Sequence, residues 1–274
     1  MIKARWFAPA GFFVSVFNQL GLDWSSLINM TRLILAVSLL FVMPARGEVE
    51  FWAVIYQPGS SAQASDMTLA SQITDVTGRS LTLNSVLLPR LPDALNKMSG
   101  QEVIVSLPPS YYFSAREKGM IPLMRYKADL LLGLYQDPLR GDVLIKTVAT
   151  PPKSSTAALV AKSLTDERVT TLETQSHTAC IRMVVAGQAD ACATGQFFID
   201  QYAERFGIEL VPRDELSAVP PVVLFVSPDI PKTERDLIAQ SPLTNGFFEY
   251  TNYIPERDDP LFERFKDAIT LTKQ

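Results

Sequence analysis

Apolar segments with the length of β-strands alternate with helical segments from about residue 49 onward. Runs such as Val49–Tyr56 and Val222–Val226 are bounded by Pro, Gly or Ser, which is typical of buried strands. This alternation predicts parallel or mixed sheets with helices on both faces. Two such series follow one another, and each is too short for a complete doubly wound domain. We therefore expect an α/β protein of two lobes, with a cleft between them.

Residues that end strands and helices, and residues that start helices, indicate the bounds of the individual elements. The expected strands are Val49–Tyr56, Ser80–Leu88, Val103–Val105, Ala128–Tyr135, Val143–Ala149, Val169–Leu172, Ala189–Ala193 and Val222–Val226. The expected helices are Thr68–Val76, Leu91–Met98, 111–118, Ser155–Leu164, Thr178–Ala186, Phe197–Phe206, and two segments that begin at Lys232 and Pro260. We expect residues 48–136 plus 222–274 to form the first lobe and residues 137–221 to form the second.

The N-terminal segment differs in character from the rest of the chain. Leu33–Met43 is apolar except for Ser38, follows a basic residue, and is succeeded by small residues at positions 45 and 47. This pattern is typical of a secretory signal peptide, and the run is shorter than the roughly 20 residues of a membrane span. We expect a signal peptide at residues 30–47, an over-extended start at residues 1–29, and export to the periplasm. An uncleaved N-terminal anchor is the alternative.

Composition excludes several classes of function. The formal net charge is −4 and the pI is near 5.2, which argues against a nucleic-acid partner because phosphate backbones are held by massed Lys and Arg. The chain lacks the G-x-x-x-x-G-K-[ST] and G-x-G-x-x-G patterns, so we expect no nucleotide and no cofactor.

The single histidine and the two cysteines leave alternatives open. His177 and Asp190 are ingredients of a hydrolase triad, but no G-x-S-x-G motif accompanies them. A metal site formed by His177, Cys180 and Cys192 matches no structural zinc spacing. In an oxidising compartment the two cysteines form either a disulfide or two buried thiols.

Three expected strand-to-helix junctions share one chemistry. They are Ser106–Tyr112, Thr150–Thr156 and Thr174–Thr178, which are rich in hydroxyl groups and contain no carboxylate. Ligands of open sheets bind beyond the carboxyl ends of the strands, where helix N-termini present free N–H groups and partial positive charge. The junctions therefore predict an anion site. The alternative is that these Ser and Thr residues only cap their helices.

Several segments together resemble a known family. They are Lys153-Ser154-Ser155-Thr156 after a Pro-Pro pair, Ser176-His177 before a helix, Gly187–Ala191 before a strand, and Pro220–Pro231. In these segments the chain resembles the phosphate/phosphite/phosphonate-binding family of periplasmic proteins that supply ABC importers. The resemblance implies the type II periplasmic-binding-protein fold, in which two lobes close on the ligand.

The resemblance also implies a binding site. Ser154, Ser155 and Thr156 would hold the oxyanion, and His177 would donate to it from the next helix start. Ser106 stands where relatives have a tyrosine, and Tyr111 and Tyr112 would line the cleft. Gly195–Phe198 lacks the acidic residue that receives the ligand amine in aminophosphonate-binding relatives, so a small oxyanion or one with an alkyl or aryl group on Phe197, Tyr111 or Tyr112 is expected.

These observations predict a monomeric, non-enzymatic solute-binding protein. Its ligand would be phosphate, phosphite, a phosphonate or a related small oxyanion, and its partner would be an ABC permease in the inner membrane. A periplasmic protein that reports its ligand to a membrane histidine kinase is the alternative. An enzyme on the same scaffold is a third possibility.

Overall fold

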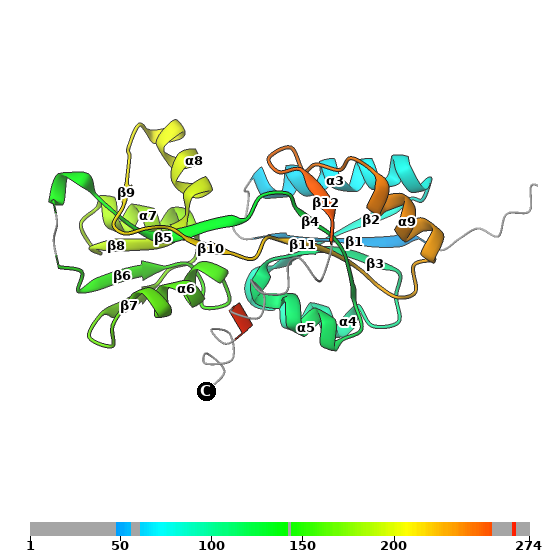
Figure 1. Ribbon diagram of the computed structural model, residues 1–274, viewed down its shortest axis with the longest axis horizontal. Helices are drawn as coiled ribbons and strands as arrows, with labels where there is room; N and C mark the ends of the chain where they lie inside the picture. The colour runs from blue at the N-terminus through cyan, green and yellow to red at the C-terminus, as the bar shows by residue number, and fades with distance from the viewer. Residues whose placement is uncertain (1–47, 56–60, 142–143, 254–264, 267–274) are drawn as a thin grey trace, which may run out of the picture. The chain divides into compact units, whose positions relative to one another are not determined.

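A computed structural model describes residues 48–55, 61–141, 144–253 and 265–266. Within this part of the chain, twelve strands form two mixed sheets of six strands each (Figure 1). The expected arrangement of two mixed sheets flanked by helices is therefore confirmed. The expected leader at residues 1–47 lies outside the described residues, as does most of the helical segment expected from Pro260.

The first sheet has the strand order β12-β4-β11-β3-β1-β2. Strand β1 pairs in parallel with β2 and β3, whereas β11 and β12 pair antiparallel with their neighbours. The strands are β1 (Val49–Ile55), β2 (Leu81–Leu87), β3 (Val103–Leu107), β4 (Ile121–Tyr126), β11 (Val223–Val226) and β12 (Tyr250–Asn252). The helices are α3 (Ser61–Thr77), α4 (Leu91–Lys97), α5 (Tyr112–Glu117) and α9 (Lys232–Gln240), with 3-10 turns at Leu88–Arg90 and Pro109–Tyr111.

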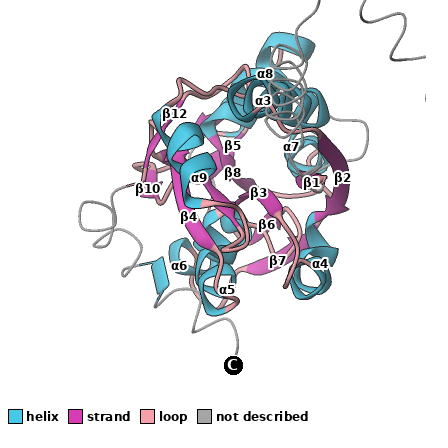
Figure 2. Cartoon of the chain, turned by 90° about the vertical axis from the view of Figure 1, so that its right-hand side faces the viewer, coloured by secondary structure: helices cyan, strands magenta, loops and turns pink. Residues whose placement is uncertain are grey.

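Helices cover both faces of this sheet, so its central strands are apolar on both sides. In β11, Val223 and Phe225 pack toward α4 and α5, whereas Leu224 and Val226 pack toward α3 and α9. Figure 2 shows these two pairs of helices on opposite sides of the sheet. Successive strand residues point to opposite faces. A strand buried on both faces therefore reads as a continuous apolar run, as this one does.

The second sheet has the strand order β10-β5-β8-β6-β7, with β9 paired to β5. Strand β6 pairs in parallel with β7 and β8, and each of these three strands is followed by a helix. The strands are β5 (Leu130–Gln136), β6 (Thr147–Thr150), β7 (Thr170–Glu173), β8 (Ala191–Gly195), β9 (Val211–Pro212) and β10 (Ser217–Val219). The helices are α6 (Thr156–Leu164), α7 (His177–Val185) and α8 (Gln196–Phe206), with a 3-10 turn at Pro138–Arg140.

Two features of the sheets differ from expectation. Strand β5, which we placed in the first lobe, pairs antiparallel with β8 in the second sheet, so the first connection between the sheets is residues 127–129. Strands β4, β9, β10 and β12 were not expected. Strand β4 contains Pro122, a residue that lacks a backbone donor and is rare inside sheets. The pairing of β4 with β11 has a register shift between Leu224 and Phe225, beside the partner position of Pro122.

In the described part of the chain, no helix combines the length and apolar character needed to cross a membrane.

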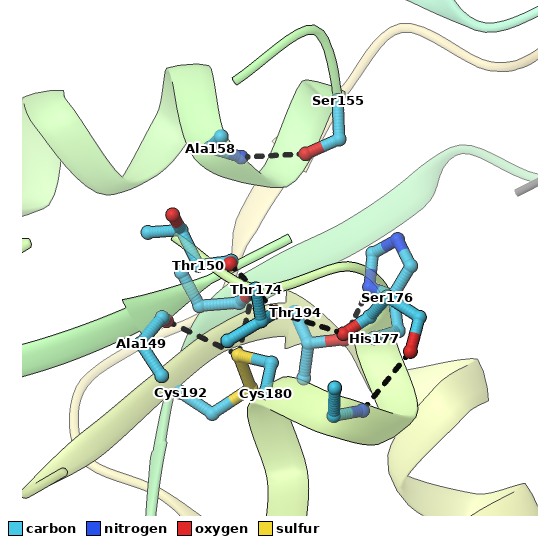
Figure 3. Close-up of a disulfide and its surroundings, with 12 residues drawn as sticks. Ala149, Thr150, Ser155, Ala158, Thr174, Ser176, His177, Cys180, Cys192 and Thr194 are labelled. Carbon is cyan, nitrogen blue, oxygen red and sulfur yellow. Dashed lines mark hydrogen bonds between the residues drawn. A yellow bond between two sulfur atoms is a disulfide. The ribbon is translucent and has the colours of Figure 1, made fainter. Parts of the chain in front are cut away.

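A disulfide between Cys180 and Cys192 joins α7 to β8 (Figure 3). The Cα atoms are 5.5 Å apart and both side chains are fully buried. The Sγ of Cys180 also lies 3.1 Å from the carbonyl oxygen of Ala149. This is a close contact and not a hydrogen bond, because a disulfide sulfur carries no proton. The disulfide holds the first turn of α7 against the start of β8.

We expect replacement of both cysteines by alanine to lower the free energy of unfolding by about 3 kcal/mol, because the bridge closes a short loop of the unfolded chain. Urea denaturation measures this difference. A reductant should lower the stability of the wild type to that of the variant and leave the variant unchanged. Equal stability of the variant and the oxidised wild type would contradict the role of the bridge.

Candidate functional site

Residues from both sheets line one cavity of about 430 Å³. Ser106 at the end of β3 and Val222 before β11 come from the first sheet. Thr156, His177 and Gly195 come from the junctions that follow β6, β7 and β8. The cavity therefore lies where the carboxyl ends of parallel strands and the starts of helices meet, as expected for open sheets.

The N-termini of α6 and α7 are capped in the same way. Ser155 Oγ accepts a hydrogen bond from the N–H of Ala158, and Ser176 Oγ accepts one from the N–H of Ala179, both at 3.1 Å. An N-cap serves one of the N–H groups that lack an intrahelical acceptor. The first two N–H groups of each helix come before these capped positions. They belong to residues that line the cavity: Thr156 and Ala157 in α6, and His177 and Thr178 in α7.

The hydroxyl group of Thr156 is a second donor at the start of α6. The side chain is 8% exposed, and its Oγ1 has no hydrogen-bond partner among the described residues. A buried hydroxyl without a partner is costly, because it has lost its hydrogen bonds to water. A bound ligand at this position would supply the missing partner.

The third helix start at the cavity has no side-chain cap. Helix α8 begins at Gln196 with Gly195 as N-cap, and Gln196 and Phe197 line the cavity. The partial positive charges of three helix ends therefore meet at this cavity. None of the three helices has an acidic residue in its first turn.

His177 is a neutral group in this site. Its Nδ1 lies 2.7 Å from Thr194 Oγ1 (Figure 3). Its ring stacks on Phe198, with the ring centroids 3.8 Å apart. Burial lowers the pKa of His177 from 6.5 to about 3. The imidazole is therefore uncharged at neutral pH and offers a hydrogen bond and not a positive charge.

The other expected site residues lie in different surroundings. Ser106 lines the cavity, but its Oγ is 3.0 Å from the hydroxyl of Tyr250. Ser154 does not line it; its carbonyl oxygen accepts a hydrogen bond from Ser110 Oγ. Of the seven hydroxyl- and imidazole-bearing residues that we expected at the site, Ser155, Thr156 and His177 are the ones brought together at the helix starts.

Tyr111 and Tyr112, which we expected to line the cleft, lie in the core instead. Tyr111 donates a hydrogen bond to the carbonyl oxygen of Leu88, and the hydroxyl of Tyr112 lies 2.6 Å from that of Tyr253. The 3-10 turn after Pro108 directs both rings into the apolar cluster beneath α4 and α5. Their position next to a junction therefore did not indicate the direction of their side chains.

The aromatic wall of the cavity comes from other segments. Tyr126 stacks on Phe248 with ring centroids 4.6 Å apart, and Phe197 of α8 lies 5.0 Å from Phe248 and 5.3 Å from Phe247. The Oδ1 of Asn245 accepts hydrogen bonds from the N–H groups of Phe247 and Phe248. The Asn245-Gly246 pair before two phenylalanines was the sequence signal for this turn.

Three carboxyl groups also line the cavity: those of Asp66, Asp129 and Asp200. Asp129 pairs with Arg125 at 3.0 Å, and the exposed Asp200 accepts a hydrogen bond from Gln196 at 2.7 Å. Asp66, in α3, is 9% exposed and has no hydrogen-bond or ion-pair partner in the described part of the chain. Burial raises the pKa of Asp66 from 3.8 to about 7. Nothing in the local sequence around Asp66 indicated its place in the site.

The contacts of His177 and Asp190 do not form a catalytic triad. His177 is paired with Thr194, whereas Asp190 accepts hydrogen bonds from Lys146 and Thr147 and joins the loop before β8 to the start of β6. The disulfide occupies both cysteines of the conceivable metal trio. Among the described residues, no cluster of three His, Cys, Asp or Glu side chains is arranged to hold a metal ion.

No protein-family model matches this sequence, and a search of curated proteins finds no match. Solved structures do resemble it. The binding protein component of an ABC phosphonate transporter from Pseudomonas aeruginosa has a TM-score of 0.61 at 12% identity, covering 83% of this chain and 89% of its own. A protein from Xanthomonas citri, XAC2383, solved bound to ATP, has a TM-score of 0.63 at 14% identity, covering 82% of this chain and 98% of its own.

A third similar structure is the truncated, arginine-bound form of ArgBP from T. maritima. Its TM-score is 0.51 at 13% identity, and the match covers 71% of this chain and 94% of that chain. At such identities the likeness establishes the fold. The protein has the two-lobe, type II fold shared by substrate-binding proteins of ABC transporters.

The single histidine of the chain allows a direct test of its charge. We expect the imidazole Cε1–H resonance of the untagged, folded protein to stay constant between about pH 5 and pH 8, because burial keeps His177 neutral. Proton NMR measures the shift. The urea-unfolded protein is the control and should titrate near its ordinary pKa of about 6.5. A folded-state midpoint near that value would contradict the neutral state.

Asp66 should make the folded protein less stable as the pH rises from about 4 to about 7. Its folded-state pKa lies above its unfolded value, so the folded state binds more protons and loses stability as that pH range is crossed. At alkaline pH, we expect the free energy of unfolding of Asp66→Asn to be about 2–4 kcal/mol higher than that of the wild type. Near pH 4, we expect the two values to be nearly the same. Urea denaturation at several pH values measures the difference.

The matched control is Asp75→Asn, which changes an exposed aspartate on the same helix. Its stability should follow that of the wild type across the pH range. A difference between Asp66→Asn and the wild type that does not change with pH would show that Asp66 is not a buried, titrating carboxyl group.

Proposed function

We propose that the protein is an exported, non-enzymatic solute-binding protein that captures phosphate, phosphite, a phosphonate or a related small oxyanion and delivers it to an ABC permease. The observation that carries this proposal is the meeting of three helix N-termini at one cavity, beside the unpartnered hydroxyl of Thr156. The similar structure from an ABC phosphonate transporter supports the same class of ligand.

The proposed binding mechanism uses oriented dipoles and not a basic patch. The free N–H groups at the starts of α6 and α7 point their partial positive charge at the cavity, and the hydroxyl of Thr156 donates to an oxyanion. The neutral imidazole of His177 adds a hydrogen bond without requiring a counter-ion. Binding should therefore depend on the charge and shape of the ligand.

The proposed coupling to transport uses the two connections between the sheets. We assign the hinge to residues 127–129 and 220–222, where the chain passes between the sheets. A ligand held by helix starts on one sheet and by side chains on the other would favour a closed arrangement of the lobes, because it binds that arrangement more tightly. The closed form would be the one that the permease recognises.

Thr156→Val tests the proposed anion site without removing a helix cap. Valine has the shape of threonine and replaces a buried hydroxyl that has no partner in the described part of the chain, so we expect the unliganded variant to be at least as stable as the wild type. Its affinity for the anion should fall about tenfold or more, because a hydrogen bond to a charged ligand is lost. Thermal shift with phosphate, phosphite, methylphosphonate, arsenate and sulfate gives the readout.

Thr165→Val is the matched control at the other end of α6. Its hydroxyl donates to the carbonyl oxygen of Ala161, away from the cavity, so stability should fall slightly while the ligand-induced shift remains. If none of these anions raises the melting temperature of the wild type, the proposed ligand class is wrong. An undiminished shift in Thr156→Val would reject the role of that hydroxyl.

A further inference from the structure

We propose that Asp66 forms a second, cation-binding subsite in the same cavity, which receives an N–H-bearing cationic group of the ligand. This inference rests on the proposed function and names the ligand class more closely: a small oxyanion that also carries a primary or secondary ammonium group. The segment in which the resembled family places its amine-binding acid is Gly195–Phe198 here and contains no carboxyl group. The proposed subsite therefore belongs to a different helix and to the other lobe.

Asp66 is the cavity carboxyl group that still lacks a partner in the described part of the chain. Asp129 is paired with Arg125, and Asp200 is exposed and bonded to Gln196. No basic group contributes to the raised pKa of Asp66, for which burial is the cause. An ionised carboxyl group in this position is costly until a cation binds beside it.

The hydroxyl groups near Asp66 are occupied by one another. Burial is the main cause of the raised pKa values of Tyr126 and Tyr250, and the charge of Asp66 adds to both. The hydroxyl of Tyr126 accepts a hydrogen bond from Asn245 at 2.9 Å, and that of Tyr250 lies 3.0 Å from Ser106 Oγ. These groups line the surroundings of Asp66 without neutralising it, which leaves its oxygens as acceptors for a ligand.

The aromatic wall of the cavity also favours a cation near Asp66. The charge of Asp66 contributes to the raised pKa of Tyr126. Phe248 stacks on Tyr126, and Phe197 packs against Phe248. The faces of aromatic rings carry partial negative charge and attract cations. An oxyanion is repelled by both the rings and the carboxyl group, so the two ends of the ligand are distinguished.

The two subsites belong to different sheets. The donors at the starts of α6 and α7 are carried by the second sheet, whereas Asp66 is on α3, which packs on the first. A ligand with an anionic and a cationic end would bridge the sheets. The ammonium group would therefore add affinity and would also favour closure of the lobes.

Isothermal titration calorimetry with matched probes tests the subsite. The probes are 3-aminopropylphosphonate, which has both charges, butylphosphonate, which has only the anion, and butylamine, which has only the cation. The wild type should bind 3-aminopropylphosphonate at least about tenfold more tightly than butylphosphonate, because a charged hydrogen bond is added. This ratio should fall to about one in Asp66→Asn and remain at the wild-type value in Asp75→Asn.

The outcomes separate this inference from the proposed function. Equal affinity of the wild type for the two phosphonates, or an unchanged ratio in Asp66→Asn, would overturn the cation subsite and leave the anion site standing. Asp66→Asn could instead weaken the binding of butylphosphonate and of 3-aminopropylphosphonate to the same degree. That result would identify Asp66 as a protonated donor to the anion and would also overturn the cation subsite. If neither phosphonate binds the wild type, the two phosphonates are excluded as ligands, and the anion screen by thermal shift decides the proposed function. Butylamine then tests the subsite by itself. Binding of butylamine that Asp66→Asn abolishes would uphold the subsite, whereas absent binding, or binding that Asp66→Asn leaves unchanged, would overturn it.

Discussion

The parallel pairing of β6 with β7 and β8 determines where the candidate site lies. Because these strands run in the same direction, the helices that follow them all begin at the same edge of the sheet. Each helix start adds free N–H groups and partial positive charge at that edge. The serine caps of α6 and α7, the glycine before α8 and the disulfide between α7 and β8 preserve this geometry. In this way the helix starts can produce a local positive potential in a chain whose net charge is negative.

The parts of the site that sequence reasoning found are those set by local structure. Ser155, Thr156 and His177 follow strands directly, so the strand-to-helix pattern was enough to bring them to one edge. Tyr111 and Tyr112 also follow a strand, yet a 3-10 turn directs them into the core. The direction of a side chain after a short turn depends on tertiary packing, which the local pattern does not report.

The residues that sequence reasoning missed reach the cavity in two different ways. Asp66 lies on the helix that precedes β2, and Phe247 and Phe248 lie in a turn near the C-terminal end of the first sheet. The positions of Phe247 and Phe248 follow from the antiparallel return of β11 and β12, which a pattern of alternating elements does not specify. Asp66 was missed because α3 begins at Ser61, before the start that we expected at Thr68. The same limit explains β5: its apolar sequence identified a strand, but its partner in the second sheet is nearly 60 residues away in the sequence.

The two ends of the cavity contain buried polar groups of opposite kinds. Among the described residues, the buried hydroxyl of Thr156 at the start of α6 has no hydrogen-bond partner, and the buried carboxyl group of Asp66 on α3 has no donor. Each deficit lowers the stability of the unliganded protein, and each is relieved by a ligand group of the complementary kind. Because the deficits lie on different sheets, they cannot relieve each other while the lobes are apart. A single ligand that satisfies both must contact both sheets, so specificity for its two ends and closure around it become one event.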